Sequence, residues 1–303
     1  MVSVIMITYN HEKYIREAIE GVLMQNVNFE LELIIADDNS PDNTEQVVLD
    51  IASSHPNGKW IKYTKHKKNK GIMPNFIWAL EQCKGKYIAM CEGDDYWTDL
   101  YKLQKQVDFL EGNEDVAGAF TDTMILENGV SSLWRKNLKT RMVFKDTVSI
   151  SAPFHTSSFL FRKDTFNNIK YDIFNNVQSG DMLLFSLVAS NGYLVKIECS
   201  PTVYRKHEGG VTNTSIHKLH LFQLNRIQLW LTVKQHVNHD HDHINNVILT
   251  HWFEIMRASG LPHHQLLTRI TFNKVIKLIG MKKTALILLR LLASKLKIPI
   301  FKN

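Results

Sequence analysis

The chain has 303 residues, of which 44% are hydrophobic and 22% charged, so it can form one large folded domain or one domain with an appendage. Its formal charge of +6 comes from the C-terminal end, because residues 274–303 hold eight of the 36 basic residues and no acid. The rest of the chain has 28 basic and 30 acidic residues, a balance that argues against a nucleic-acid-binding domain. No apolar run approaches the roughly 18 residues that cross a bilayer, and three cysteines without metal-ligand spacing argue against a disulfide framework.

The first third of the sequence alternates between strand-like and helix-like segments. We predict strands at residues 2–7, 31–36, 60–63 and 87–91, and helices at residues 12–25, 42–53 and 73–83. Either Asp42 or Ser40 is placed to cap the second helix. This alternation predicts right-handed βαβ units, and therefore a parallel sheet covered by helices on both faces.

The pattern becomes mixed after about residue 117. A helix is predicted over SGDMLLFSLVASNG and is closed by Gly192, and YLVKIE reads as a strand. From about residue 215 the sequence is mostly helical in period. The four histidines of the run 236–243 share no helical face, so we interpret them as surface residues rather than a metal site.

Three polar stretches stand where predicted strands end. They are TYN (8–10), ADDNSPDN (36–43) and EGDDYW (92–97). Ligands of parallel α/β sheets bind at the carboxyl ends of the strands, and the topology would bring these stretches to one edge. We therefore expect them to form a single site.

The residue types at this edge suit a nucleotide with a metal-bound diphosphate. A carboxylate can accept the imide N–H of uracil, and a tyrosine can stack on the base. The adjacent carboxylates of Asp94 and Asp95 repel each other unless a cation compensates. Mg²⁺ or Mn²⁺ would do so, because both take hard oxygen ligands and bridge phosphates.

The stretches VSVIMITYN, LIIADDNSPDNT, YIAMCEGDDYW and the later SGD, taken together, resemble the motifs of family 2 glycosyltransferases over about residues 1–212. The resemblance implies the GT-A fold, which is an α/β fold with a Rossmann-like, mostly parallel sheet and helices on both faces. It places a catalytic domain at 1–214, with a nucleotide-sugar half at about 1–99 and an acceptor half at about 100–214. We expect residues 215–303 to be a helical C-terminal extension.

The resemblance also implies roles for residues of the nucleotide site. Thr8, Tyr9 and Asn10 would line the base pocket, and Asp38 or Asp37 would bind uracil N3–H. The two alternatives for the uracil contact stay open.

Further roles implied by the resemblance concern the metal and the acceptor. Asp95 would ligate Mn²⁺ or Mg²⁺ directly, and Asp94 would face the ribose or the sugar. His207 matches a loop that closes over the diphosphate and reaches the metal, and Asp181 falls at the position of the base that deprotonates the acceptor. His155 is expected to be a packed polar residue next to the acceptor.

We therefore expect a metal-dependent, inverting glycosyltransferase of the hexosyl or N-acetylhexosaminyl type. Its donor would be a nucleotide sugar, with UDP favoured and dTDP or GDP open, and its acceptor a hydroxyl of a glycan or lipid-linked glycan during synthesis of a cell-surface polysaccharide. Inversion is favoured because one base suffices and no second nucleophilic carboxylate is needed.

Three alternatives are weighed against this function. A nucleotidyltransferase usually has a glycine-rich basic loop after the first strand, and TYNHEKY has no glycine. A receiver or binding module carries its acid pair after the first strand and is far shorter. A catalytically inactive nucleotide-binding homologue would not need the intact set of Asp38, Asp95 and Asp181.

The basic segment 274–303 mixes leucine-rich turns with lysines and carries no acid. Such a helix suits an anionic membrane surface, and it equally suits packing on the catalytic domain or on a second copy of the chain in a homo-oligomer. The N-terminus has no basic leader, so we expect a cytoplasmic protein. If the basic segment binds a membrane, we expect peripheral attachment to the inner face of the plasma membrane.

Overall fold

The computed structural model describes residues 1–167, 169–210, 219–258, 276 and 280. The chain divides into two compact units. The first comprises residues 1–147 and 152–210, and the second joins residues 148–151 to the chain from 211 onward. The predicted domain boundary at 214 remains a proposal.

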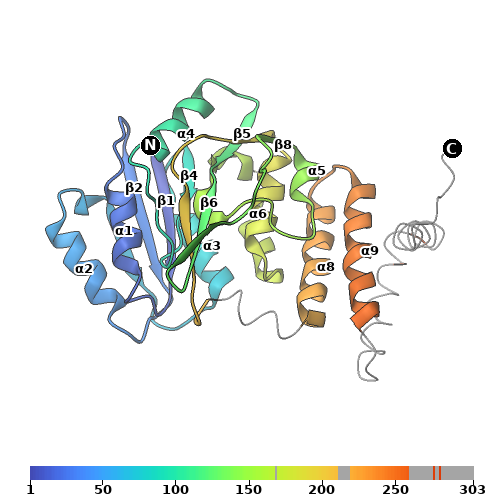
Figure 1. The fold of residues 1–303 in the computed structure, drawn as a ribbon, viewed down its shortest axis with the longest axis horizontal. Coiled ribbons are helices and arrows are strands. Elements are labelled where there is room, and N and C mark those ends of the chain that lie inside the picture. Colours follow the sequence, from blue (N-terminus) through green and yellow to red (C-terminus); the bar gives the residue numbers. More distant parts are fainter. Residues whose placement is uncertain (168, 211–218, 259–275, 277–279, 281–303) are drawn as a thin grey trace. The chain divides into compact units, whose positions relative to one another are not determined.

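A large sheet in the first unit has the strand order β3-β2-β1-β4-β9-β5-β10-β8. Figure 1 labels β1, β2, β4, β5 and β8 of this sheet. Its strands are β1 (Val2–Thr8), β2 (Leu31–Asp37), β3 (Ile61–Lys65), β4 (Tyr87–Met90), β5 (Val116–Phe120), β8 (Arg141–Met142), β9 (Leu160–Arg162) and β10 (Tyr193–Lys196). β3, β2, β1 and β4 are parallel, as are β5 and β10. β9 runs antiparallel between β4 and β5, and β8 runs antiparallel to β10.

A smaller sheet has the order β11-β6-β7. Its strands are β6 (Thr123–Glu127), β7 (Val130–Leu133) and β11 (Thr202–Lys206). β11 is parallel to β6, and an isolated bridge joins Val203 of β11 to Tyr96. The bridge attaches this sheet to the segment that follows β4.

Helices cover both faces of the large sheet, and the predicted mostly parallel α/β fold is confirmed. They are α1 (Ile15–Leu23), α2 (Thr44–Ser54), α3 (Ile72–Gln82), α4 (Lys102–Glu111), α5 (Phe144–Thr147) and α6 (Gly180–Ala189), with 3₁₀ turns η1 (Gly58–Trp60), η2 (Thr156–Ser158), η3 (Lys163–Phe166) and η4 (Tyr171–Asn176). Because side chains alternate along a strand, one face of β1, β2 and β4 forms a core with α1, α2 and α4. α3 packs on β1 and β2 from other positions, and α6 packs on β5 and β10.

A buried polar network supports the segment after β4. The Trp97 indole N–H donates to the Ser157 carbonyl at 2.7 Å, and the Lys102 ammonium lies 4.2 Å from the centre of the Trp97 ring. Lys102 donates to Gln106 at 2.9 Å, and Gln106 in turn donates to the carbonyls of Ala119 and Ser158. The network therefore joins α4 and the segment that follows β4 to β5 and η2.

Lys102 should make stability increase with pH in the alkaline range. Burial lowers the pKa of this fully buried lysine to about 8 from the usual 10.5. Between these values the unfolded chain binds more protons than the folded protein, so the free energy of unfolding rises with pH. We therefore expect the free energy of unfolding of wild type minus that of Lys102→Met, measured in urea, to rise between pH 7.5 and 10. The same difference for Lys68→Met, at an exposed position, should stay constant. A constant difference for Lys102→Met would contradict the assignment.

The second unit contains α8 (Leu219–His236) and α9 (His241–Ala258), which pack against each other. Ring nitrogens of His236, His241 and His243 bind the backbone carbonyls of Thr232, Val237 and Val148. None of the helices in the described part of the chain combines the length and apolar character that crossing a bilayer requires. The predicted basic tail 274–303 lies outside the described residues apart from positions 276 and 280.

Candidate functional site

Two asparagines turn the chain at the ends of β1 and β2. Asn10 has φ 61° and Asn39 has φ 65°, in the left-handed region that asparagine tolerates better than most residues. The two turns are joined, because the Asn10 N–H donates to the Ser40 hydroxyl at 2.9 Å. TYN and DDNS therefore lie side by side, as the sequence predicts.

Both aspartates at the end of β2 are buried and accept hydrogen bonds. Asp37 accepts from the Ser40 N–H at 2.7 Å and the Tyr63 hydroxyl at 2.8 Å. Asp38 accepts from the N–H groups of Lys70 and Gly71 at 2.7 and 2.8 Å. Each carboxylate oxygen has a second lone pair, so these bonds leave room for another donor. They also fix the loop 66–71 against the end of β2.

The acidic turn 92–95 presses against the end of β1, and glycine is required at its second position. A Cβ atom on Gly93 would lie 2.8 Å from the Thr8 hydroxyl oxygen and 3.0 Å from Nδ1 of His11. Any side chain here would separate the turn from the loop after β1. The EGDD spacing thus has a packing reason as well as a chemical one.

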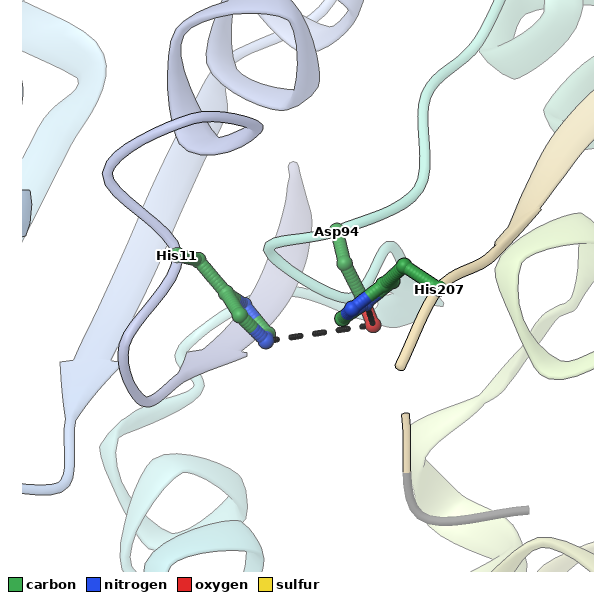
Figure 2. Close-up of side chains that lie close together, drawn as sticks. All are labelled: His11, Asp94 and His207. Carbon is green, nitrogen blue, oxygen red and sulfur yellow. Dashed lines mark hydrogen bonds and ion pairs between the residues drawn. The ribbon is translucent and has the colours of Figure 1, made fainter. Parts of the chain in front are cut away.

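His11, Asp94 and His207 form a cluster at this edge (Figure 2). Oδ2 of Asp94 lies 3.1 Å from Nε2 of His207 and 3.8 Å from Nε2 of His11, and all three potential ligand atoms lie within 4.8 Å of one another. Burial disfavours the charge on Asp94, but the hydrogen bond from His207 and the positive potential of both histidines outweigh it and lower the Asp94 pKa. Burial lowers the pKa of His11, which favours the neutral, metal-binding imidazole.

Asp95 points into a different environment from Asp94. It is 1% exposed, and its Oδ1 accepts the backbone N–H of Arg205 at 3.1 Å. Nδ1 of His155 lies 3.6 Å from its other oxygen. Burial, reinforced by the charge of Asp94, raises the Asp95 pKa well above its usual value, and burial lowers the pKa of His155 to about 4. These directions favour the neutral form of both groups, and Nδ1 of His155 is engaged by Ser157, whose hydroxyl lies 2.9 Å away, rather than by Asp95.

The sequence predicts that Asp95 ligates the metal and that Asp94 faces the ribose or sugar. In the structure the carboxylate between the two histidines is that of Asp94. His207, predicted to reach the metal, lies in that cluster. His11 was not among the predicted site residues, because no motif spacing connects it to residues 94 and 207; its only signal was its place directly after TYN.

Arg205 braces the acidic turn from β11. Its guanidinium donates to the Asp94 carbonyl at 2.8 Å and to the Glu17 carboxylate of α1, and it lies 4.4 Å from the centre of the Tyr96 ring. It is only 9% exposed. Arg205 thereby sets the position of His207, which follows two residues later in the chain.

Glu92, the first residue of the acidic turn, is influenced by the charge of Asp181. Oε2 of Glu92 is buried without a hydrogen-bond partner in the described part of the chain. Burial, followed by the charge of Asp94, raises the pKa of Glu92 to about 8, and Asp181 contributes to the rise. Asp181 is therefore close enough for its charge to act on the acidic turn.

Asp181 is the second residue of α6 and is half-buried. Gly180 before it is buried, and a Cβ atom there would lie 2.5 Å from the sulfur of Met73 at the start of α3. The glycine of SGD thus lets α6 begin close to α3. This approach sets where Asp181 stands at the edge.

The residues predicted to line the base pocket differ in exposure. Thr8 is 2% exposed, and its hydroxyl has no hydrogen-bond partner in the described chain. Tyr9 is 47% exposed. Tyr9 and Asn10 line an open cavity of about 870 Å³ together with His11 and His207. Of the residues predicted to bind the nucleotide, Tyr9 and Asn10 thus border the same space as the two histidines, whereas Thr8, Asp37, Asp38 and Asp94 are not among the residues that line it.

Known sequences resemble a large part of this chain. The family model described as glycosyl transferase family 2 matches residues 3–190. An uncharacterized protein of Mycobacterium tuberculosis is 32% identical over 220 residues, covering 70% of this chain and 61% of that protein. The minor teichoic acid biosynthesis protein GgaB of Bacillus subtilis is 29% identical over 193 residues, covering 62% of this chain and 21% of GgaB. The chain spans less than two thirds of the length of these curated relatives.

Solved structures share the fold. TarS 1–349 of S. aureus in complex with UDP-GlcNAc gives a TM-score of 0.68 at 17% identity, over 91% of this chain and 80% of that chain. The mannosyltransferase PcManGT from Pyrobaculum calidifontis in complex with GDP-Man and Mn²⁺ gives 0.54 at 16% identity, over 96% and 75%.

Proposed function

Since the chain belongs to glycosyl transferase family 2, we propose that it is a metal-dependent, inverting enzyme that moves a sugar from a nucleotide sugar to an acceptor hydroxyl. The observation that carries the proposal is the gathering of acidic and histidine side chains at the carboxyl edge of the sheet. The buried aspartates at the end of β2, the cluster around Asp94 after β4, and Asp181 at the start of α6 all stand at the terminus of an element of the fold.

A uridine nucleotide is the donor we favour. Asp37 and Asp38 are buried acceptors with lone pairs to spare, which suits the N3–H of uracil. The complexes of TarS with UDP and UDP-GlcNAc support this choice. The complex of PcManGT with GDP-Man makes a GDP-sugar the alternative donor. The relative named for teichoic acid biosynthesis favours a cell-surface glycan as acceptor.

For the metal site we assign Asp94 and His207 as ligands, in place of Asp95. The cluster fits a divalent cation, because an ionised carboxylate and imidazole nitrogens converge within 4.8 Å. Such an ion, when bound, neutralises charge that develops on a departing diphosphate. Asp95 instead holds the turn by accepting the Arg205 N–H, so it acts as a positioning residue.

Asp181 is the base in this proposal. A carboxylate there would take the proton of the acceptor hydroxyl as that oxygen attacks the anomeric carbon. Glu92, which burial and the charge of Asp94 keep protonated up to about pH 8, adds no second negative charge between Asp94 and Asp181. The turn can thus hold one ionised carboxylate for the metal while Asp181 serves the acceptor.

A screen of nucleoside diphosphates with Mn²⁺ tests the donor. Ligands that bind only the folded protein raise its melting temperature, so we expect UDP with Mn²⁺ to give the largest rise among UDP, GDP and dTDP. Asp38→Asn should reduce the rise with UDP, and Asp50→Asn on the exposed face of α2 should not. A larger rise in melting temperature with GDP than with UDP would change the assigned donor to a GDP-sugar. Retention of the anomeric configuration in product NMR would exclude inversion.

A further inference from the structure

His11 stands where a third protein ligand of the metal would stand. Its Nε2 lies 3.8 Å from Oδ2 of Asp94, and the rings of His11 and His207 are nearly perpendicular at 87° (Figure 2). The three residues come from the loop after β1, the turn after β4 and the end of β11. An ion between them would therefore tie three separate segments together.

The position of His11 is fixed by its backbone and its neighbours. Its N–H donates to the Thr44 hydroxyl at 3.0 Å, and its carbonyl accepts from the N–H groups of Tyr14 and Ile15 at 2.9 Å. The side chain is only 16% exposed, and the missing side chain of Gly93 makes room for its Nδ1. The imidazole is thus held at the cluster rather than reaching it from solvent.

Neither ring nitrogen of His11 has a hydrogen-bond partner in the described part of the chain. Nδ1 is buried and has no hydrogen-bond partner among the described residues. Nε2 faces the Asp94 carboxylate at a distance longer than a hydrogen bond. Nε2 therefore makes no hydrogen bond within the described chain and is available to an ion held by Asp94.

We propose that His11 ligates the metal with Asp94 and His207, and that this donor set selects a transition-metal ion such as Mn²⁺ or Co²⁺ over Mg²⁺. Mg²⁺ prefers oxygen ligands in octahedral geometry and usually binds one or two carboxylates plus substrate phosphates. Imidazole suits transition metals, whose affinities rise from Mn²⁺ through Co²⁺. The inference rests on the metal site of the proposed function but not on sugar transfer.

A second consequence is binding of the ion before the nucleotide. Three side chains that converge within 4.8 Å supply three ligands without any phosphate. A site with one carboxylate would need the diphosphate to complete its coordination. The chain alone should therefore bind one Mn²⁺ or Co²⁺ with no donor present.

Metal binding is measured on the full chain without nucleotide. Free Mn²⁺ is followed by electron paramagnetic resonance, Co²⁺ by its visible absorption, and Mg²⁺ by competition against Co²⁺. We expect wild type to bind one ion and a thousandfold excess of Mg²⁺ not to displace it. His11→Gln should weaken Co²⁺ binding by at least roughly tenfold, since even residues that only orient ligands cost 10- to 100-fold. The control His239→Gln, in the histidine run, should bind as wild type does.

His11→Asp separates ligation from a structural role. It changes the donor set to one imidazole and two carboxylates, so Mg²⁺ should now compete with Co²⁺ at least roughly tenfold better than in wild type. An unchanged Co²⁺ to Mg²⁺ preference in this variant would overturn the proposal. Should the variants not fold, X-ray absorption of Co²⁺-loaded wild type counts the imidazoles: two support the proposal and one refutes it. Failure of sugar transfer with intact metal binding would instead count against the proposed function.

Discussion

Asp94→Asn is expected to reduce sugar transfer by roughly 10³-fold while the protein stays folded. An amide oxygen has nearly the volume of a carboxylate oxygen but carries no charge, so it is a poor ligand for a hard divalent ion. Losing several kcal/mol of charge stabilisation at about 1.4 kcal/mol per factor of ten gives this magnitude. Initial rates with UDP-sugar and Mn²⁺ measure the loss, and far-ultraviolet circular dichroism checks the fold.

Asp95→Asn is the matched control for this change. Asp95 is buried, its pKa is raised by burial, and its role is to accept the Arg205 N–H, which an asparagine oxygen also does. We expect activity within about tenfold of wild type, because no charge that the reaction uses is removed. If Asp95→Asn were the more damaging change and Asp94→Asn retained activity, the metal would belong to Asp95, as the sequence predicts.

Asp181→Asn is expected to reduce the turnover rate by at least roughly 10²-fold without weakening nucleotide binding. A base acts on the acceptor proton in the transition state, so its loss lowers kcat rather than donor affinity. Isothermal titration with UDP and Mn²⁺ measures the affinity, and single-turnover transfer measures the rate. Removing an acid from the first turn of α6 also costs about 0.3–1 kcal/mol of stability, which a melting curve will register.

A control for this substitution is Asp115→Asn, which neutralises an exposed carboxylate that pairs with Arg141. It should leave both rate and affinity unchanged. An Asp181→Asn protein with weaker UDP binding and a normal rate would show that Asp181 contacts the donor. The base would then have to come from another side chain at the edge.

β1, β2 and β4 were predictable because they are buried on both faces. They are mostly apolar in sequence, and the helices between the strands of the first third have a clear 3.6-residue period. The region between residues 117 and 162 was not predictable in detail. Its strands are short, half-exposed or antiparallel, and β9 has only three residues. Its place in the sheet depends on neighbours that are distant in sequence.

The site was predictable as a set of loops but not as a set of contacts. Three strand ends at one edge follow from the topology, and so does the gathering of their polar residues. Which of two adjacent aspartates faces the site depends on how the turn is braced, here by Arg205, which is 111 residues away from Asp94. The convergence of His11 with His207 depends likewise on β11 pairing with β6.

The antiparallel β9 has a consequence for how the chain is made. β4 ends at residue 90, but β9, the strand that pairs with its outer edge, spans Leu160–Arg162. β5 pairs with the same strand, so it too lacks this partner until β9 has been synthesised. At a synthesis rate of about 5–20 residues per second, β4 keeps an unpaired edge for several seconds while the nascent chain lengthens. Unpaired edges invite pairing with other chains. A chain cut before residue 160 would keep this edge unpaired, so we expect it to aggregate more readily than the full chain.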